Sequence, residues 1–298
     1  MLAAIRVVNK PDRYEEKRKM PYSPEKKEYF RNLTREIRLT VLKMIHEAGS
    51  GHAGGSLSAV ELVTTLYFDK MSVDPSNPKW ENRDRFIPSK GHCAPTLYAV
   101  LAEKGFFPKP ELNTFRRFNS ILQGHPDLLK TPGVDMSTGS LGHGPSVGIG
   151  MALAGRLSKK DFYVYVLIGC GEMNEGQIWE AAMAAVKFKL DHLIVLLDYN
   201  RYQLDGAMGD IMPLGDVTAK WKSFGWNVIE VNGHEPEDIA EGIDQAKKTK
   251  GIPSILIAYT VKGKGVSFME NTHVWHGKQI SAQEYAQAVS ELTEIVHA

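Results

Sequence analysis

Six of the ten histidines stand next to a glycine, and this is the first pattern in the sequence that could do chemistry. With 27 glycines in 298 residues, about two such neighbours are expected. Glycine lets the backbone turn sharply or approach a ligand closely, and imidazole exchanges protons near neutral pH. The set therefore predicts polar loops around a reacting substrate, although any single pair is also typical of an ordinary polar turn. The six are His52, His92, His125, His143, His234 and His276. Their spacings match no compact zinc motif, which disfavours metal ligation.

A second pattern combines a strand, a glycine turn and a helix. The apolar run Tyr163–Ile168 leads into Gly169-Cys170-Gly171, and a helical pattern begins at Gln177. Free amides and the dipole at such a helix start favour a phosphate group. The turn matches neither the G-x-G-x-x-G nor the P-loop pattern, which argues against dinucleotide and P-loop proteins. Thirty residues after Cys170, the next apolar run is followed by Asn200, so two strand ends can meet at one site.

The elements that must position these residues follow from hydrophobic periodicity. From residue 28 apolar side chains recur every three or four positions, which predicts a helix that ends at Gly49. Strands are predicted at Tyr163–Ile168, Leu193–Leu197, Val228–Val231 and Ile255–Tyr259, with helices at Gln177–Phe188 and Glu237–Lys248. Strands of near-continuous apolarity are typical of sheets covered on both sides. The fold class is therefore α/β, a parallel sheet with helices on both faces. Residues 1–27 are predicted to be a solvated arm and residues 28–298 one domain.

Composition excludes several classes of protein. The 36 Lys and Arg against 35 Asp and Glu give a net charge of +1, so no basic field holds a nucleic acid. No apolar stretch approaches the roughly 20 residues that cross a bilayer, so no membrane partner is expected. Two cysteines cannot form a dense disulfide framework, and no signal sequence opens the chain. We therefore expect a cytoplasmic protein.

The sequence resembles the thiamine-diphosphate enzymes and, within them, the transketolases. The family motif is Gly-Asp-Gly at a strand end with an Asn about thirty residues later, which corresponds to Gly169-Cys170-Gly171 and Asn200. Further blocks in transketolase order are Ser50-Gly51-His52, Asp84-Arg85-Phe86, Ser89-Lys90-Gly91-His92, Gly124-His125-Pro126, Thr138-Gly139-Ser140-Leu141-Gly142, Glu175-Gly176, Lys262-Gly263-Lys264-Gly265 and Trp275-His276-Gly277. The resemblance covers roughly residues 30–280. It implies the thiamine-diphosphate-binding fold, in its diphosphate domain.

The resemblance also implies where the cofactor thiamine diphosphate binds. The residues that match the family's cofactor site are Lys90, His92, Gly139, Ser140, Leu141, Gly171, Glu172, Glu175, Asn200, Lys262 and His276. Asn200 and the backbone carbonyl of Tyr202 match ligands of Mg²⁺ (or Ca²⁺), hard cations that prefer oxygen. The histidines that match the substrate channel are His52, His92, His125 and His276. Their implied work is to bind sugar hydroxyls and to shuttle protons.

The implied activity is ketol transfer from a ketose (phosphate) to an aldose (phosphate), as in the pentose phosphate pathway. In the family a pyrimidine-binding domain supplies the Glu that activates the cofactor. This sequence stops about twenty residues after Trp275-His276-Gly277, before any such domain. We therefore expect the N-terminal subunit of a split transketolase. Its partner would be a complementary C-terminal subunit, in a heterotetramer with two copies of each chain.

Cys170 is the main departure from the family pattern, because it stands where the family has an acidic metal ligand. A thiol is a soft, weak ligand for Mg²⁺ or Ca²⁺. Two alternatives therefore stay open. One is another thiamine-diphosphate enzyme subunit, similar to deoxyxylulose-phosphate synthase or a 2-oxo-acid dehydrogenase. The other is a cofactor-binding scaffold without turnover.

Overall fold

The first helix, α1 (Pro24–Ala48), opens the part of the chain that the computed structural model describes, residues 22–294. It begins at Pro24 because Ser23 caps it, accepting a bond from the Lys26 amide at 3.2 Å. It ends at Gly49, where φ is +65°. The hydrophobic periodicity thus predicted the end of this helix correctly, but it predicted the start at residue 28, four residues late. Residues 1–21 of the predicted arm lie outside the described residues, and the division at residue 27 stays a prediction.

Five parallel strands form one sheet in the order β1-β2-β3-β5-β4. They are β1 (Arg85–Pro88), β2 (Val164–Gly169), β3 (Leu193–Tyr199), β4 (Asn227–Asn232) and β5 (Ser254–Tyr259). Four of them were predicted from apolar runs, and β1 was missed. Since all neighbours run parallel, the carboxyl ends of the strands lie along one edge of the sheet. The α/β fold class is confirmed.

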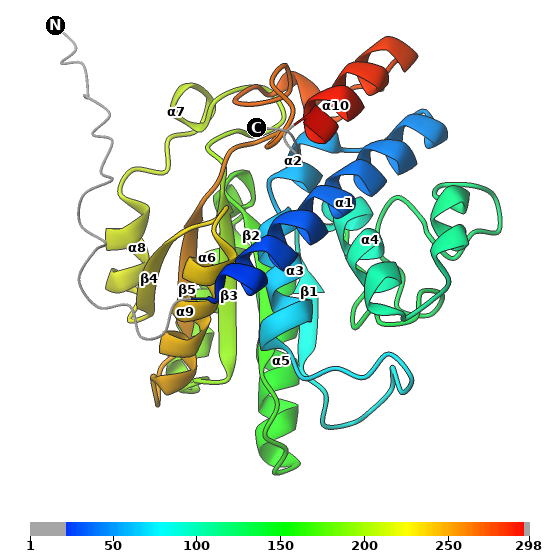
Figure 1. Ribbon diagram of the computed structural model, residues 1–298. Helices are drawn as coiled ribbons and strands as arrows, with labels where there is room; N and C mark the ends of the chain where they lie inside the picture. Colours follow the sequence, from blue (N-terminus) through cyan, green and yellow to red (C-terminus); the bar gives the residue numbers. More distant parts are fainter. Residues whose placement is uncertain (1–21, 295–298) are drawn as a thin grey trace, which may run out of the picture.

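Helices cover both faces of this sheet (Figure 1). One face carries α1, α2 (Ala53–Leu57), α3 (Val60–Thr65), α4 (Ala94–Lys104) and α9 (Pro236–Lys248), and α10 (Ala282–Glu294) packs on α1. The other face carries α5 (His143–Leu157), α6 (Gly176–Lys187) and α8 (Val217–Ser223). Short helical turns lie at Leu66–Lys70, Gly91–Cys93, Lys109–Thr114, Gly171–Asn174, Met208–Ile211 and Val274–His276.

Alternate residues of each strand belong to opposite cores. Tyr165 and Leu167 of β2 pack with the α1 side, while Val164, Val166 and Ile168 pack with the α5 side. All five are fully buried, and each apolar side chain of this size stabilises the fold by about 1.5–3 kcal/mol on burial. This two-sided burial explains why the strands read as continuous apolar runs.

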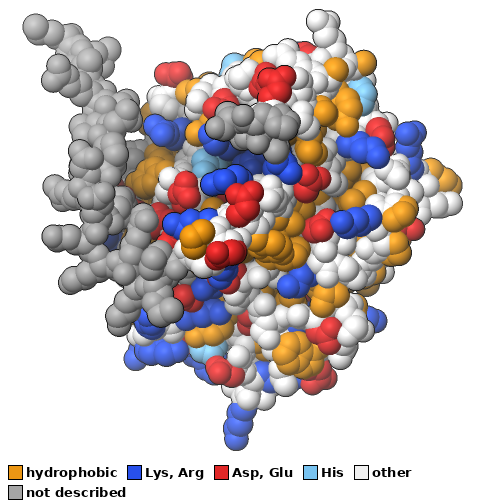
Figure 2. Space-filling model, viewed as in Figure 1, with side chains coloured by type: hydrophobic (Ala, Val, Ile, Leu, Met, Phe, Trp, Pro, Cys, Tyr) orange, Lys and Arg blue, Asp and Glu red, His pale blue; other side chains and the backbone are white. Residues whose placement is uncertain are grey.

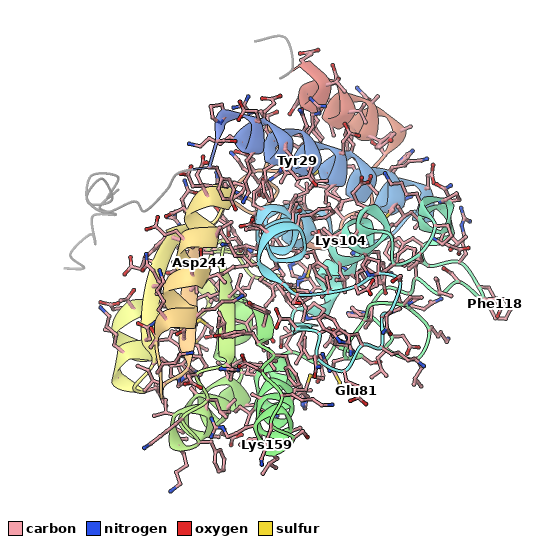
Figure 3. All side chains as sticks on the ribbon, turned by 60° about the horizontal axis from the view of Figure 1, so that its bottom comes forward. Tyr29, Glu81, Lys104, Phe118, Lys159 and Asp244 are labelled. Carbon is pink, nitrogen blue, oxygen red and sulfur yellow. The ribbon has the colours of Figure 1, made fainter. Side chains whose placement is uncertain are left out.

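The surface mixes charges of both signs. Figure 2 shows lysine and arginine side chains interspersed with aspartate and glutamate over the face in view. Phe118 is 95% exposed and projects from the loop that links Lys109–Thr114 to α5 (Figure 3). Within residues 22–294, no helix combines the length and the apolar character needed to cross a lipid bilayer.

Candidate active site

A buried aspartate organises the carboxyl edge of the sheet. Asp198 lies near the end of β3 with no exposed surface. Its carboxylate accepts bonds from Ser58 Oγ at 2.6 Å, from Thr260 Oγ1, and from Asn200 Nδ2 at 3.1 Å. Lys90 Nζ forms an ion pair with the same carboxylate. These bonds join loops after β1, β3 and β5 to the segment between α2 and α3.

Two buried lysines of different character meet at this edge. Lys90 is 2% exposed and donates to Gly55 O at 2.8 Å; burial opposes its charge, but Asp198 outweighs burial and raises its pKa. Lys262 is equally buried, and its ammonium meets only His276 Nδ1 at 2.9 Å and Gln203 O at 3.3 Å. Burial and then Lys90 lower the pKa of Lys262 to about 8. Lys262 therefore carries a charge without an anionic partner among the described residues.

Four histidines from separate segments converge above the lysines. The ring centre of His52 lies 5.2 Å from that of His92, 5.5 Å from that of His276 and 6.5 Å from that of His125. The rings of His92 and His276 are 5.1 Å apart. The predicted substrate-channel histidines are thus brought together.

The same histidines are held neutral by their surroundings. Burial, followed by Arg116, lowers the pKa of His52 to about 4, and burial, followed by Lys262, lowers that of His276 to about 3. Burial and then Lys90 bring the pKa of His92 well below its ordinary value. Burial and Arg116 also lower the pKa of His125. At neutral pH each ring therefore has one nitrogen that can donate a hydrogen bond and one that can accept.

Cys170 faces the two oxygens that match the family's metal ligands. Its Sγ lies 3.5 Å from Asn200 Oδ1 and 3.7 Å from Tyr202 O. Asn200 Oδ1 also accepts from the Tyr202 amide at 3.1 Å, and the Asn200 amide nitrogen donates to Asp198, which fixes the orientation of the side chain. Burial raises the pKa of Cys170, so the group is a thiol at neutral pH. Asn200, Tyr202 and Cys170 thus form one oxygen and sulfur cluster.

Glu172 accepts hydrogen bonds from the turns that surround the site. Its Oε1 accepts from the Gly142 amide at 2.8 Å and from Ser89 Oγ, and its Oε2 accepts from the Gly169 amide at 3.0 Å. Burial raises its pKa. Glu172 thus ties the turns after β1 and β2 to the start of α5, and its contact with the cofactor stays a prediction.

The remaining predicted residues form the rim of the site. Gly139 lies beside His125, because a Cβ at Gly139 would be 3.3 Å from His125 Cδ2. His125, Gly139 and Ser140 are exposed, and Leu141 is half-buried. Glu175 is exposed next to Gly142, where a Cβ would lie 2.9 Å from Glu175 Cβ. Gly171 packs on Gln203, because a Cβ added at Gly171 would lie 2.9 Å from Gln203 Cβ.

Sequence reasoning gave Asp198 and Ser58 no role in the site. A signal for Asp198 was available, because it is an acidic residue directly after the apolar run Leu193–Leu197, where a buried charge needs partners. Ser58 had no such signal, because only the fold brings it to the end of β3.

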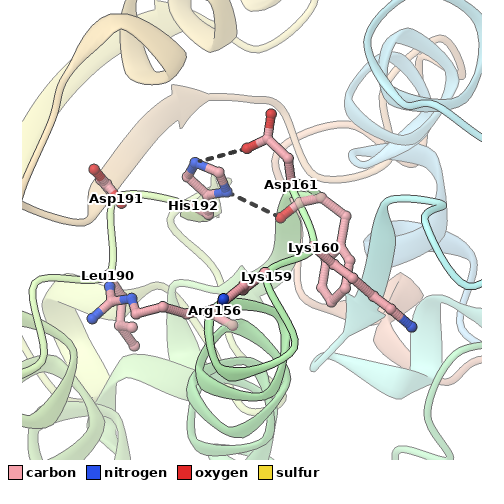
Figure 4. Close-up of a pocket in the computed structure, with 9 residues that line it drawn as sticks. Arg156, Lys159, Lys160, Asp161, Leu190, Asp191 and His192 are labelled. Carbon is pink, nitrogen blue, oxygen red and sulfur yellow. Dashed lines mark hydrogen bonds and ion pairs between the residues drawn. The ribbon is translucent and has the colours of Figure 1, made fainter.

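A surface pocket lies at the opposite edge of the sheet, where β2 and β3 begin (Figure 4). Two of its basic side chains are already engaged: Arg156 donates to Phe188 O and Lys189 O, both at 2.7 Å, and Lys160 pairs with Glu81. His192 bonds Phe162 O at 3.2 Å. Over residues 22–294, no group of three or more His, Cys, Asp or Glu side chains could hold a metal ion. The candidate active site is therefore the cluster at the carboxyl edge.

Comparison with known proteins identifies the family of the chain. The profile of the family described as "Transketolase, thiamine diphosphate binding domain" matches residues 30–293. The chain is 45% identical over 257 residues to one of the subunits of the apulose-4-phosphate transketolase of Phocaeicola vulgatus, covering 86% of this chain and 91% of that protein. It is 46% identical over 256 residues to a "6-deoxy-6-sulfo-D-fructose transketolase subunit" of a Clostridium species, covering 86% of this chain and 93% of that protein.

A solved structure of the transketolase from Campylobacter jejuni superposes with a TM-score of 0.85 at 30% identity. The match covers 89% of this chain and 43% of that longer chain. The fold and the site define an α/β protein with a thiamine-diphosphate-binding domain. The chain belongs to the transketolase family.

Proposed function

We propose that this chain is the diphosphate-binding subunit of a split transketolase, which transfers a two-carbon ketol unit from a ketose phosphate to an aldose phosphate. The observation that carries the proposal is the position of Lys262 at the carboxyl edge of the sheet. It has no anionic partner among the described residues, and it contacts His276, one of four clustered neutral histidines. A buried cation suits an anionic tail, and neutral imidazoles suit a substrate rich in hydroxyl groups.

Thiamine diphosphate fits the residues present. Lys262 and His276 would hold its diphosphate, with Lys90 nearby, and the Gly171 turn would add amides at a helix start. When bound, the cofactor supplies the carbon that carries the two-carbon unit. Gly139 lets the backbone lie close to His125 beside the site, because a Cβ there would be 3.3 Å from His125 Cδ2 and would require that ring to shift.

The histidines would do the proton chemistry. A neutral imidazole can accept the proton of a substrate hydroxyl and return it when the oxygen is released. His52, His92 and His276 lie close enough together to contact one small substrate. Their low pKa values keep them uncharged at neutral pH, so each ring offers the substrate one hydrogen-bond donor and one acceptor.

Mg²⁺ or Ca²⁺, the cations expected from the family, do not fit this donor set well. Asn200 Oδ1 and Tyr202 O are suitable oxygens, but the third group of the cluster is the Cys170 thiol. Hard cations take six or more oxygens and bind sulfur poorly.

A partner chain would supply the activating Glu, in an assembly of two copies of each chain. Support comes from the two relatives named as subunits, of which this chain spans more than nine tenths. Those relatives are named for apulose 4-phosphate and 6-deoxy-6-sulfo-D-fructose, so a sugar carrying an anionic group is the expected substrate class. A cytoplasmic protein of the pentose phosphate pathway would fit this activity.

A non-catalytic cofactor scaffold is the second candidate, and Cys170 is the observation that favours it. The two functions separate in one experiment. The purified chain is combined with its complementary subunit, thiamine diphosphate and Mg²⁺, and product formation is followed with a ketose phosphate and an aldose phosphate, or with pyruvate. Ketol transfer supports the proposal, decarboxylation of pyruvate supports another enzyme of the cofactor class, and cofactor binding without turnover supports the scaffold.

A further inference from the structure

Several bonds hold the turn that carries Lys262, and three of them lie at Val261, Gly263 and Lys264. The turn follows β5 and spans residues 260–265. The Gly263 amide donates to Gly54 O at 3.0 Å, and Gly263 has a φ of +80°. A Cβ at Gly54 would lie 3.1 Å from Lys262 Cγ, so the lysine stem lies directly against α2. The other two bonds, at Val261 and Lys264, flank Lys262 and are made by side chains from distant elements.

Those side chains form a chain of three residues, in which Arg38 and Glu61 are buried and His234 is half-buried. Arg38 of α1 donates from Nε to Lys264 O at 3.0 Å and pairs with Glu61 of α3 at 2.6 Å. Glu61 in turn bonds His234 Nδ1 at 3.0 Å, and His234 Nε2 accepts from the Val261 amide at 2.8 Å. Arg38 and Glu61 are 6% and 5% exposed. Arg38, Glu61 and His234 therefore bind the backbone on both sides of Lys262.

The bonds define the proton arrangement of His234. A backbone amide can only donate, so Nε2 must be the acceptor and the ring proton must sit on Nδ1. That N–H then donates to the Glu61 carboxylate. Removing any one of the three side chains would leave a buried polar group without its partner.

A purely structural role does not require such an arrangement. Taking an ion pair out of water is costly, and packed apolar residues often stabilise a core as well or better. What an ion pair with a bridging histidine adds is a single geometry for the backbone it binds. That backbone carries the lysine whose ammonium meets His276 at 2.9 Å.

We propose that Arg38, Glu61 and His234 are positioning residues that hold the Lys262 ammonium where it binds the diphosphate group of the cofactor. The inference rests on the proposed function, since it takes Lys262 to bind diphosphate. None of the three residues touches the cofactor site itself, and each acts through the 260–265 turn.

The test measures the dissociation constants of thiamine diphosphate and inorganic pyrophosphate by titration calorimetry on the intact chain. His234→Leu removes both bonds, whereas His234→Gln keeps a donor and an acceptor. We expect His234→Leu to weaken binding on the order of tenfold and His234→Gln to restore most of the loss. In a Lys262→Met background, His234→Leu should change affinity less than about twofold, because the two residues act through one contact.

His192→Leu is the matched control. His192 also bonds a backbone carbonyl and faces an aspartate, Asp161 at 3.5 Å, but it lies at the opposite edge of the sheet. It should leave both affinities unchanged. Equal losses from His234→Leu in the two backgrounds, or no loss in a folded His234→Leu protein, would overturn the inference.

A second measurement needs no variant. Nitrogen-15 NMR of labelled histidines should show His234 protonated on Nδ1 and bare on Nε2, and the opposite tautomer would also overturn the inference. The proposed function fails separately. If the wild-type chain and its Lys262→Met variant bind neither probe, both ideas are wrong, whereas a Lys262-dependent affinity that ignores His234 rejects only the positioning role.

Discussion

Cys170 determines how this site can bind a metal ion. Its thiol lies within 3.7 Å of two oxygens that would suit Mg²⁺, and at neutral pH it brings no negative charge. Replacing it with a carboxylate adds an anionic oxygen at the same place. We expect Cys170→Asp to tighten thiamine diphosphate binding about tenfold in the presence of Mg²⁺, as measured by titration calorimetry.

Two control variants separate charge from the loss of a thiol. Cys170→Ser removes sulfur without adding charge, and Cys93→Ser changes the other buried cysteine. Neither should tighten binding, and without Mg²⁺ the advantage of Cys170→Asp should disappear. Equal or weaker affinity of Cys170→Asp with Mg²⁺ would reject this account of the site.

Lys262 gives the site a pH dependence of known sign. Its pKa is about 8, so the ammonium is charged below that pH and loses its charge above it. If only the charged form binds diphosphate, affinity for thiamine diphosphate falls about tenfold between pH 7 and pH 9. Calorimetric titrations at several pH values check this slope, which Lys262→Met should abolish.

The groups around Lys262 should not cause the same fall in affinity between pH 7 and pH 9. The pKa of Lys90 is raised, that of Asp198 is lowered and that of His276 is about 3. The pKa of Cys170 is raised above that of an ordinary thiol. A slope that persists unchanged in Lys262→Met would show that another group carries it.

At the scale of elements, the start of α5 is pressed against the turn after β1. A Cβ at Gly144 would lie 2.3 Å from Ser89 Cβ, although Gly150 of the same helix has nothing within 4 Å. Gly144→Ala should therefore cost about 1–3 kcal/mol through overpacking, and it should weaken cofactor binding because Ser89 precedes Lys90. Gly150→Ala should stabilise the chain by about 0.5–1 kcal/mol.

Urea unfolding of both variants provides the measurement. The two changes add the same methyl group to one helix, so helix propensity cancels in the comparison. A Gly144→Ala protein as stable as Gly150→Ala would mean that α5 and the Ser89 turn are not in the contact described.

The sequence predicted the elements whose hydrophobic period is strong and missed one that is short. β2, β3 and β5 were predicted because each contains an apolar run of five or six residues, and β4 because three of the four residues Val228–Val231 are β-branched. β1 has only four residues, begins with Arg85 and ends with Pro88, so neither period nor composition marks it. Its place comes from tertiary pairing, as Phe86 lies opposite Tyr165 of β2.

The same distinction holds within the candidate site. The histidines, Lys90 and Lys262 were found from glycine turns and from the family resemblance. The bonds from the Gly142 and Gly169 amides to Glu172 were not predicted, because a sequence position does not say which way a carboxylate points. Its contact with the cofactor stays a prediction. Ser58 and Thr260, which both donate to Asp198, each lie more than 60 residues from it in the sequence. Local sequence patterns do not encode such contacts.

At the scale of the whole molecule, one side of the candidate site is open. Lys90 and Lys262 are buried, whereas His125, Gly139, Ser140 and Glu175 at the rim are exposed. Transfer of a reactive two-carbon unit requires that water be kept out. A partner chain that covers this rim would both exclude water and bring the activating carboxylate.

If a partner chain supplies the activating Glu, as proposed, the chain alone should bind thiamine diphosphate and still fail to transfer a ketol unit. Mixing it with the complementary subunit should produce activity, and light scattering should then give the mass of two copies of each chain. A mixture made with His52→Ala should assemble to the same mass but show strongly reduced turnover, which separates assembly from chemistry. Turnover of a ketose phosphate by the purified chain on its own would contradict the need for a partner.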